Sequence, residues 1–441
     1  MNPILNLYRI KGGIDMSTGQ VALEHNKPPA KSIAAAVAGN ALEFYDFIIY
    51  SFFAVYIGKS FFPAGNEHVS LLASVAVFGV GFFTRPLGGV LIGAYADKKG
   101  RRAAMMLTVA LITLGTLGLA ATPSYEKIGI AAPIIVVIAR MIQGLALGGE
   151  VGPASAMLIE SAPPNKRAFY ASWQMASQGI AVVIGGLVGY AVSSNLTSEQ
   201  LGAWGWRIPF LVSLVLIPIA LYIRRALPET LEEPTHHSGT QMIEIIFSRY
   251  GKEVILGIMV LMATAITAQV GNYMTTFAIN TLNFDPKIAQ ICTILGGLMM
   301  FLFSLLAGIL ADKYGRKSII LWPRVALMLL IVPMFYLLVK TESVAMLLLV
   351  TMMVTLLTGM SGASSLVAIP EMMPIALRAT GVSIVYAIGV TLFGGTAQLV
   401  LTWLIEHFGA VSPAYYVVVT SLLSIIATLM MPETRHVNVK D

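Results

Sequence analysis

Twelve apolar segments, each long enough to cross a lipid bilayer, dominate this sequence. A spanning helix needs about 20 apolar residues, and its backbone must satisfy its own hydrogen bonds because lipid offers no partners. Charged residues make up only 11% of the chain, less than half of the roughly 25% usual in soluble proteins. This excludes a water-soluble enzyme or nucleic-acid-binding protein and predicts an all-α membrane protein with twelve transmembrane helices. The predicted spans are residues 33–57, 70–95, 103–122, 129–157, 169–192, 207–224, 253–279, 288–311, 318–339, 343–369, 379–403 and 413–431.

The spans fall into two sets of six, separated by the longest polar connection inside the chain. The first 32 residues lack the apolar core of a secretory signal, and Met16 offers an alternative start to Met1. The predicted organisation is a cytoplasmic tail at 1–32, a six-helix bundle at 33–224, a cytoplasmic linker at 225–252, a second six-helix bundle at 253–431 and a short cytoplasmic tail at 432–441.

Lysine and arginine are concentrated in the connections on one side of the predicted spans. Loops rich in these residues stay cytoplasmic. Both termini are therefore predicted to be cytoplasmic, in a plasma membrane of the bacterial inner-membrane type. The formal net charge of +6 then reflects membrane topology rather than binding to nucleic acid. Arg324 is placed among the cytoplasmic cations, and formal charges within the spans are expected only in the first, second and fourth.

Three charged motifs occur once in each set of six spans, in the same order. G-x3-D-K-x-G-R-[RK] follows the second and eighth spans, E-x2-P-x3-R the fourth and tenth, and P-E-T the sixth and twelfth. The repetition indicates two halves related by an axis along the membrane normal. The aspartate can cap a neighbouring helix or pair with an arginine, which favours a conformational latch over a mere topology anchor. The predicted latch residues are Gly93, Asp97, Gly100, Arg101, Glu150, Glu160, Arg167, Asp312, Gly315, Arg316, Glu371 and Arg378.

The doubled motif and twelve spans resemble the major facilitator superfamily. Within it, four runs resemble the metabolite:proton symporter family, and the run Phe169-Tyr-Ala-Ser-Trp-Gln-x-Ala-Ser-Gln178 is most similar to citrate and tricarballylate–proton symporters. The resemblance implies a proton-coupled carrier of a small organic acid. The four runs are Gly39-Asn-x-Leu-Glu-Phe-Tyr-Asp-Phe47, Arg85-Pro-x-Gly-Gly89, Arg140-x2-Gln-Gly-x3-Gly-Gly-Glu150 and Trp204-Gly-Trp-Arg-Ile-Pro209.

Two acids in the first span are the predicted proton-coupling residues. Glu43 and Asp46 stand three residues apart and share a helix face, which Asn40 and Tyr50 extend. Two close carboxylates do not both ionise easily in a low dielectric, so one is expected to hold a proton reversibly. A structural ion pair with an arginine is the alternative reading. Every histidine lies outside the spans, so a proton relay within the membrane must use carboxylates.

Two arginines within the spans are the candidate ligands for an anion. Arg140 and Arg85 carry a permanent charge and a planar fork that matches a carboxylate. Fixed pairing with Glu43, Asp46 or Glu150 is the alternative, and Glu150 itself is read as a structural partner.

Uncharged polar stripes mark further candidate substrate contacts. Gln174 and Gln178 lie one turn apart in the fifth span, and Gln269, Asn272 and Tyr273 follow helical spacing in the seventh. A polar stripe facing lipid would leave its hydrogen bonds unmade, so these stripes are expected to line a cavity. Hydrogen bonding between helices is the alternative. Tyr386 in the eleventh span is a weaker candidate of the same kind.

The predicted function is proton-coupled import of citrate or a related tricarboxylate by alternating access. A 2-oxoglutarate or dicarboxylate symporter, a proline/betaine symporter, and a membrane-embedded enzyme or sensor are the alternatives. One cysteine allows no intrachain disulfide, and no P-loop or H-E-x-x-H pattern occurs. We expect no metal or cofactor beyond the coupling proton, no nucleic-acid partner, and a monomer in the lipid bilayer.

Overall fold

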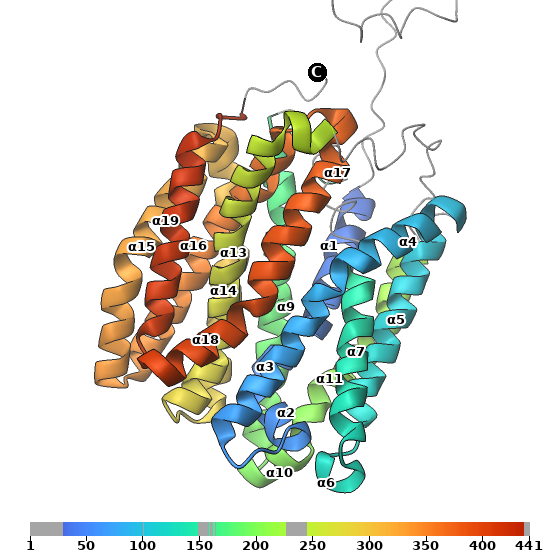
Figure 1. Ribbon diagram of the computed structural model, residues 1–441, viewed down its shortest axis with the longest axis vertical. Helices are drawn as coiled ribbons and strands as arrows, with labels where there is room; N and C mark the ends of the chain where they lie inside the picture. The colour runs from blue at the N-terminus through green and yellow to red at the C-terminus, as the bar shows by residue number, and fades with distance from the viewer. Residues whose placement is uncertain are drawn as a thin grey trace, which may run out of the picture.

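The computed structural model describes residues 30–99, 101–148, 158, 162–163, 165–225 and 245–435. In this part of the chain all regular structure is helical, and long helices stand side by side as a bundle (Figure 1). The all-α prediction is confirmed. Most of the predicted linker and both predicted tails lie outside the described residues.

The helices before the linker form the first set. Their bounds are α1 Ala30–Phe52, α2 Ala54–Phe61, α3 Glu67–Phe83, α4 Arg85–Lys99, α5 Arg101–Ala121, α6 Tyr125–Ile128, α7 Ala131–Gly148, α9 Arg167–Asn195, α10 Ser198–Ala203, the 3-10 helix η2 Gly205–Arg207 and α11 Ile208–Arg225.

The helices after the linker form the second set. Their bounds are α13 Gly251–Thr276, the π-helical turn η3 Phe277–Thr281, α14 Pro286–Tyr314, α15 Arg316–Thr341, α16 Val344–Glu371, α17 Ile375–Tyr386, the π-helical segment η4 Ala387–Gly394, α18 Gly395–Phe408 and α19 Ser412–Met430.

Each of the twelve predicted spans overlaps at least one helix; the fourth is described only to Gly148, where α7 ends. Within the described residues, nine helical stretches are long and apolar enough to cross a membrane. The pair Val37–Phe52 and Ala54–Phe61, bent by 64°, covers the first predicted span. Two shorter apolar helices, Met106–Ala121 and Gly205–Val215, overlap the third and sixth.

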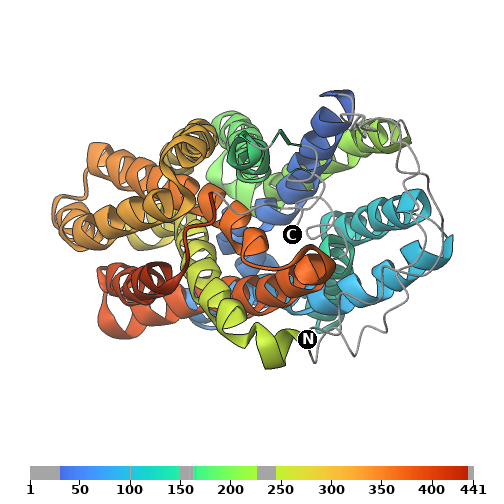
Figure 2. The same ribbon diagram turned by 90° about the horizontal axis from the view of Figure 1, so that it is seen from above.

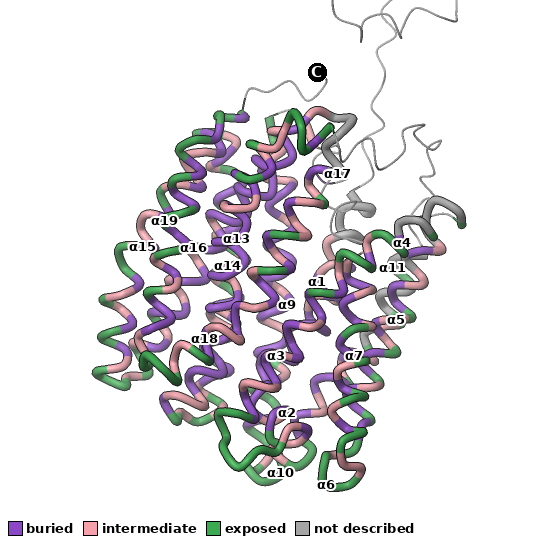
Figure 3. Tube along the Cα trace, in the orientation of Figure 1, coloured by how far each residue is buried: buried purple, intermediate pink, exposed green. Residues whose placement is uncertain are grey.

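Each set of helices has its own apolar core. One cluster of buried side chains runs from Tyr45 to Phe210 and includes the fully buried Trp206. Another runs from Val270 to Val417. Buried positions in Figure 3 follow the inward faces of the helices in both sets. This pattern agrees with two six-helix bundles, whose predicted boundaries stay predictions.

Helices α9 and α14 join the two sets along their length (Figures 1 and 2). A Cβ atom on Gly179 would lie 2.6 Å from the Phe301 nitrogen, and one on Gly297 would lie 2.8 Å from the Val183 nitrogen. Such distances leave room for glycine only. The backbones of α9 and α14 are therefore in direct contact, which holds the two sets together.

The start of α15 explains one glycine and one acid of the repeated motifs. Gly315 has φ +101°, which favours glycine, and a Cβ there would lie 2.5 Å from Glu433 Oε2. The Glu433 carboxylate accepts hydrogen bonds from the backbone nitrogens of Arg316 (2.9 Å) and Lys317 (3.1 Å). The P-E-T motif that follows the last span thus caps α15.

The structure overturns the placement of Arg324. Because α15 already begins at Arg316, Arg324 lies about two turns inside a spanning helix. Its side chain is 1% exposed. It is a buried cation rather than a loop residue, and the expectation that only the first, second and fourth spans carry charge is wrong.

Candidate functional site

Asp46 lies at the centre of a buried hydrogen-bonded cluster built from four helices. Its Oδ1 accepts hydrogen bonds from Thr116 Oγ1 on α5 and Ser213 Oγ on α11, both at 2.6 Å. Its Oδ2 accepts one from Gln143 Nε2 on α7 at 2.7 Å. Asp46 is 2% exposed. Three donors around one buried carboxylate stabilise its ionised form.

Gln143 connects Asp46 to Arg140. The amide oxygen of Gln143 accepts a hydrogen bond from Arg140 Nη1 at 2.7 Å, while its nitrogen donates to Asp46. The expected alternative, a direct ion pair between Arg140 and an acid of the first span, is not formed within the described residues. Instead, the Gln143 amide lies between the two charged groups and is hydrogen-bonded to both.

Arg140 is fully buried among aromatic rings. Its guanidinium carbon lies 4.3 Å from the centroid of the Phe47 ring and 4.6 Å from that of Tyr50. Arg140 Nε and Nη2 donate to no acceptor among the described residues. The cation is thus held by rings and by one amide, and two of its nitrogens remain available to a ligand.

Arg85 contacts the same Phe47 ring as Arg140. Its guanidinium carbon is 4.4 Å from the Phe47 centroid and 4.1 Å from that of Phe82. Tyr386, at the end of α17, is close enough to Arg85 to interact electrostatically. The two predicted anion ligands, Arg85 and Arg140, therefore share one aromatic ring and make this part of the molecule electropositive.

Glu43 and Asp46 share a helix face, as expected. Both line a small pocket between α1, α5 and α11, together with apolar side chains such as Val109 and Ile217. This pocket lies inside the first set of helices.

Asn40 and Tyr50 have other neighbours than these two acids. Asn40 donates to Ser177 Oγ on α9 at 2.6 Å, and Tyr50 OH accepts from Ser74 Oγ on α3 at 3.5 Å. Asn40 and Tyr50 thus contact α9 and α3, and they do not extend the pocket that Glu43 and Asp46 line.

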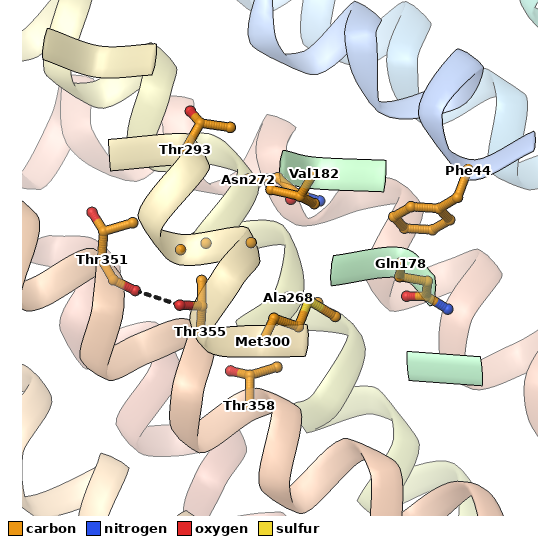
Figure 4. A pocket seen from close by; sticks show the side chains of 13 residues that line it. Phe44, Gln178, Val182, Ala268, Asn272, Thr293, Met300, Thr351, Thr355 and Thr358 are labelled. Carbon is orange, nitrogen blue, oxygen red and sulfur yellow. Dashed lines mark hydrogen bonds between the residues drawn. The ribbon is translucent and has the colours of Figure 1, made fainter. Parts of the chain in front are cut away.

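A second pocket lies between the two sets of helices and has no formal charge in its lining (Figure 4). Phe44, Gln178 and Val182 border it from the first set, and Asn272 on α13 borders it from the second. Its remaining polar lining consists of threonine hydroxyls. The empty space between the lining residues, counted with the solvent at its mouth, is about 450 Å³. The threonines are Thr293, Thr351, Thr355 and Thr358.

The other residues of the predicted polar stripes contact neighbouring helices. Gln269 Oε1 accepts a hydrogen bond from Gln398 Nε2 on α18 at 2.9 Å, and Tyr273 OH lies 2.9 Å from Thr402 Oγ1. The backbone oxygen of Gln174 accepts from Asn40 Nδ2 at 3.4 Å. Of the residues in these stripes, only Gln178 and Asn272 border the pocket. The cavity-lining interpretation therefore fits these two residues, and hydrogen bonding between helices fits Gln269 and Tyr273.

Three predicted latch residues of the second half, Asp312, Arg316 and Glu371, converge where α14 ends and α15 begins. Arg316 donates to both oxygens of Glu371, at 3.0 and 3.1 Å, and lies 3.3 Å from Asp312. The Glu371 carboxylate also accepts a hydrogen bond from Thr434 Oγ1 at 2.7 Å. Arg167 interacts electrostatically with Glu371 and Asp312.

Asp312 connects the two sets of helices directly. Its carboxylate oxygens accept hydrogen bonds from the backbone nitrogens of Ala168 (3.0 Å) and Phe169 (2.9 Å), at the first turn of α9. An acid at a helix N-terminus satisfies otherwise unpaired N–H groups and complements the helix dipole. This arrangement is the one that the aspartate of the repeated motif predicts.

Of the predicted latch residues of the first half, Arg167 lies within the described part of the chain. Gly100, Glu150 and Glu160 lie outside the described residues, as do the side chains of Asp97 and Arg101 and the surroundings of Gly93; the side chain of Arg378, in the second half, is also outside them.

We expect Asp312→Asn to weaken the contact between α14 and α9. A carboxylate at a helix N-terminus contributes about 1 kcal/mol, so states with the two sets separated should gain roughly fivefold in population. Distances between spin labels at Lys166→Cys and Lys313→Cys, in a Cys292→Ser background, would measure this. Asp285→Asn makes the same change of charge at the other end of α14, where Asp285 accepts a hydrogen bond from the Lys287 backbone nitrogen, and serves as the control. An unchanged distance distribution in Asp312→Asn would contradict the latch.

Sequence reasoning missed three residues of the Asp46 cluster. Thr116, Gln143 and Ser213 lie in largely apolar spans, and each has a neutral side chain. Gln143 stood within a motif but was not assigned a role. The available signal was a polar residue at the depth of Asp46 in several spans of the same half.

Comparison with known proteins identifies the family. The model of the major facilitator superfamily matches residues 36–395 and 280–441. The chain belongs to this superfamily. It is also similar in fold to a D-xylose-proton symporter of known structure, with a TM-score of 0.74, 20% identity, and coverage of 92% of this chain and 98% of that one.

Relatives with different substrates in their names are almost equally similar to this chain. A citrate-proton symporter of Salmonella typhi is 33% identical over 91% of this chain and 93% of its own length. A proline/betaine transporter of Escherichia coli (strain K12) is 32% identical, covering 92% and 84%. An alpha-ketoglutarate permease of the same strain is 31% identical, covering 91% and 93%. These are transporters, and they match the predicted function and its two transport alternatives.

Proposed function

We propose that this chain imports citrate or a related tricarboxylate together with protons, by alternating access across a bacterial inner membrane. The single observation that carries the proposal is the chain of contacts Asp46–Gln143–Arg140, which couples an acid to an arginine through one amide. The similarity to a citrate-proton symporter supports the choice of substrate. We further propose that both termini are cytoplasmic and that the chain acts as a monomer.

Asp46 is the proposed proton site, with Glu43 beside it in the same pocket. A hydroxyl can reverse its role and accept a hydrogen bond, but the amide nitrogen of Gln143 can only donate. A proton on Asp46 Oδ2 therefore weakens the hydrogen bond from Gln143, because it removes the negative charge and occupies one of the acceptor positions of that oxygen. The amide of Gln143 can then move, which changes its hydrogen bond with Arg140. Protonation of Asp46 thereby affects the arginine proposed to bind the anion.

Arg140 and Arg85 are the proposed source of attraction for the anion. Phe47, which both arginines contact, is one turn along α1 from Phe44, which borders the neutral pocket. A carboxylate near this ring meets two cations, while the hydroxyls and amides of Gln178, Asn272 and the threonines bind the uncharged part of the substrate. Guanidinium groups suit this role because they bind carboxylates with two parallel hydrogen bonds.

Uptake into sealed proteoliposomes tests the proposal. With an inward proton gradient, we expect labelled citrate to accumulate and a protonophore to abolish the accumulation. Empty liposomes and a reversed gradient are the controls. Failure to accumulate citrate or any other acid or zwitterion would refute proton-coupled symport.

A zwitterionic osmolyte is the second candidate substrate. The neutral lining of the pocket between the two sets of helices favours it, because a betaine carries no net charge. Parallel uptake of citrate, 2-oxoglutarate and glycine betaine separates the candidates. Uptake of betaine without citrate would leave the proton coupling in place and replace the proposed substrate.

A further inference from the structure

The two halves bury opposite charges in corresponding places. Asp46 lies among spans one, three, four and six, on α1, α5, α7 and α11. In the order of the repeat, their counterparts are α13, α15, α16 and α19. Arg324 on α15 is buried among these helices and has no role in the proposed proton or substrate site.

Every acceptor that Arg324 donates to among the described residues is neutral. Its Nη2 donates to Thr264 Oγ1 at 2.8 Å, and its Nη1 donates to Thr267 Oγ1 and the Ala263 backbone oxygen, both at 3.2 Å. Its Nε donates to no acceptor, and no carboxylate of the described residues forms an ion pair with it. A cation buried to 1% exposure without a counter-charge is strongly unfavourable in a low dielectric.

The same layer of the bundle contains further unpaired donors. Nearer to the start of α15, one buried apolar cluster contains a residue from each of the four helices: Val260, Ile320, Ala368 and Ala427. One helical turn further along α15, the helical spacing places Thr264, Arg324, Ser364 and Ser424 together in the next layer. The bond between Arg324 and Thr264 confirms this register for two of the helices.

Serine hydroxyls complete the layer on α16 and α19. Ser364, Ser424 and, one turn beyond, Ser421 are fully buried, and their Oγ atoms have no hydrogen-bond partner among the described residues. Arg324 Nε brings the number of unpaired donor groups in this region to four. Guanidinium and hydroxyl groups together form a suitable shell for an anion, whereas a cation would be repelled by Arg324.

We propose that Arg324, Ser364, Ser421 and Ser424 form a binding site for a small anion inside the second half. The ligand contacts Arg324 through one negatively charged group, which is either a halide ion or a single carboxylate. Its charge compensates that of Arg324, and the serine hydroxyls donate to it. The site is separate from the pocket between the halves and does not depend on the proposed symport.

Equilibrium binding of radioactive chloride to the purified full-length chain in detergent tests this site. We expect saturable binding and a higher midpoint of thermal unfolding in chloride than in gluconate, by a few degrees at about 100 times the dissociation constant. Arg324→Gln should abolish both effects. Arg207→Gln is the matched control, because Arg207 also binds neutral backbone oxygens but lies at the other end of the first half.

A milder variant and a competitor complete the test. Ser424→Ala removes one donor without removing the charge, and it should weaken chloride binding several-fold even if Arg324→Gln fails to fold. Citrate that displaces chloride, or binds alone and loses affinity in Ser424→Ala, would identify a carboxylate as the ligand. Absence of binding by both anions, or binding unchanged in both variants, would overturn the proposal. None of these measurements requires transport, so they stand apart from the test of symport.

Discussion

Asp46→Asn is expected to abolish proton-driven accumulation while exchange of substrate across the membrane continues. Asparagine keeps the shape and can still accept hydrogen bonds from Thr116 and Ser213, but it cannot bind and release a proton. Because a positioned proton-transfer group contributes about 100-fold or more, uphill uptake should fall by at least that factor. Counterflow needs no net proton movement and should persist. Both are measured in proteoliposomes with the same labelled substrate.

Glu67→Gln is the matched control for Asp46→Asn. Glu67, at the start of α3, forms an exposed ion pair with Lys59 on α2, so its replacement should leave uptake unchanged. Equal loss of accumulation and counterflow in Asp46→Asn would mean that Asp46 is needed for substrate movement itself. Normal accumulation in that variant would move the proton site elsewhere, with Glu43 tested next.

Arg140→Gln is expected to lower kcat/KM for an anionic substrate at least about 30-fold. The change removes a buried cation that touches the Phe47 and Tyr50 rings and donates to Gln143. Removing one partner of a buried charged interaction costs about 2–5 kcal/mol, which corresponds to this factor or more. Initial uptake rates over a range of substrate concentrations measure the effect. Uptake of a zwitterion that survives while citrate uptake is lost would show that Arg140 binds the anion's net charge.

The double variant Asp46→Asn with Arg140→Gln distinguishes coupling from independent loss. If the amide of Gln143 links the two residues, removing both charges should cost much less than the product of the single losses. Arg207→Gln is again the control, since Arg207 stacks on Trp206 outside this cluster. A loss in the double variant equal to the product of the two single losses would contradict the proposed coupling between Asp46 and Arg140.

The sequence alone determined the fold class, the twelve spans and the family. These follow from local properties: runs of apolar residues predict spanning helices, and motifs repeated in order predict two related halves. The same local information placed Glu43 beside Asp46, since three residues along a helix share a face. The latch motif also predicted that Asp312 would reach a neighbouring helix.

Only the tertiary structure decided which side chains meet across helices. Gln143 separates Arg140 from Asp46, Asn40 reaches Ser177 rather than the acids, and Arg324 lies buried rather than in a loop. Each of these outcomes depends on how a helix is rotated about its axis and where it begins. In a membrane protein the apolar pattern surrounds much of each helix, so it leaves that rotation open. Packing at close contacts, such as Gly179 against α14, sets the rotation and thereby the site.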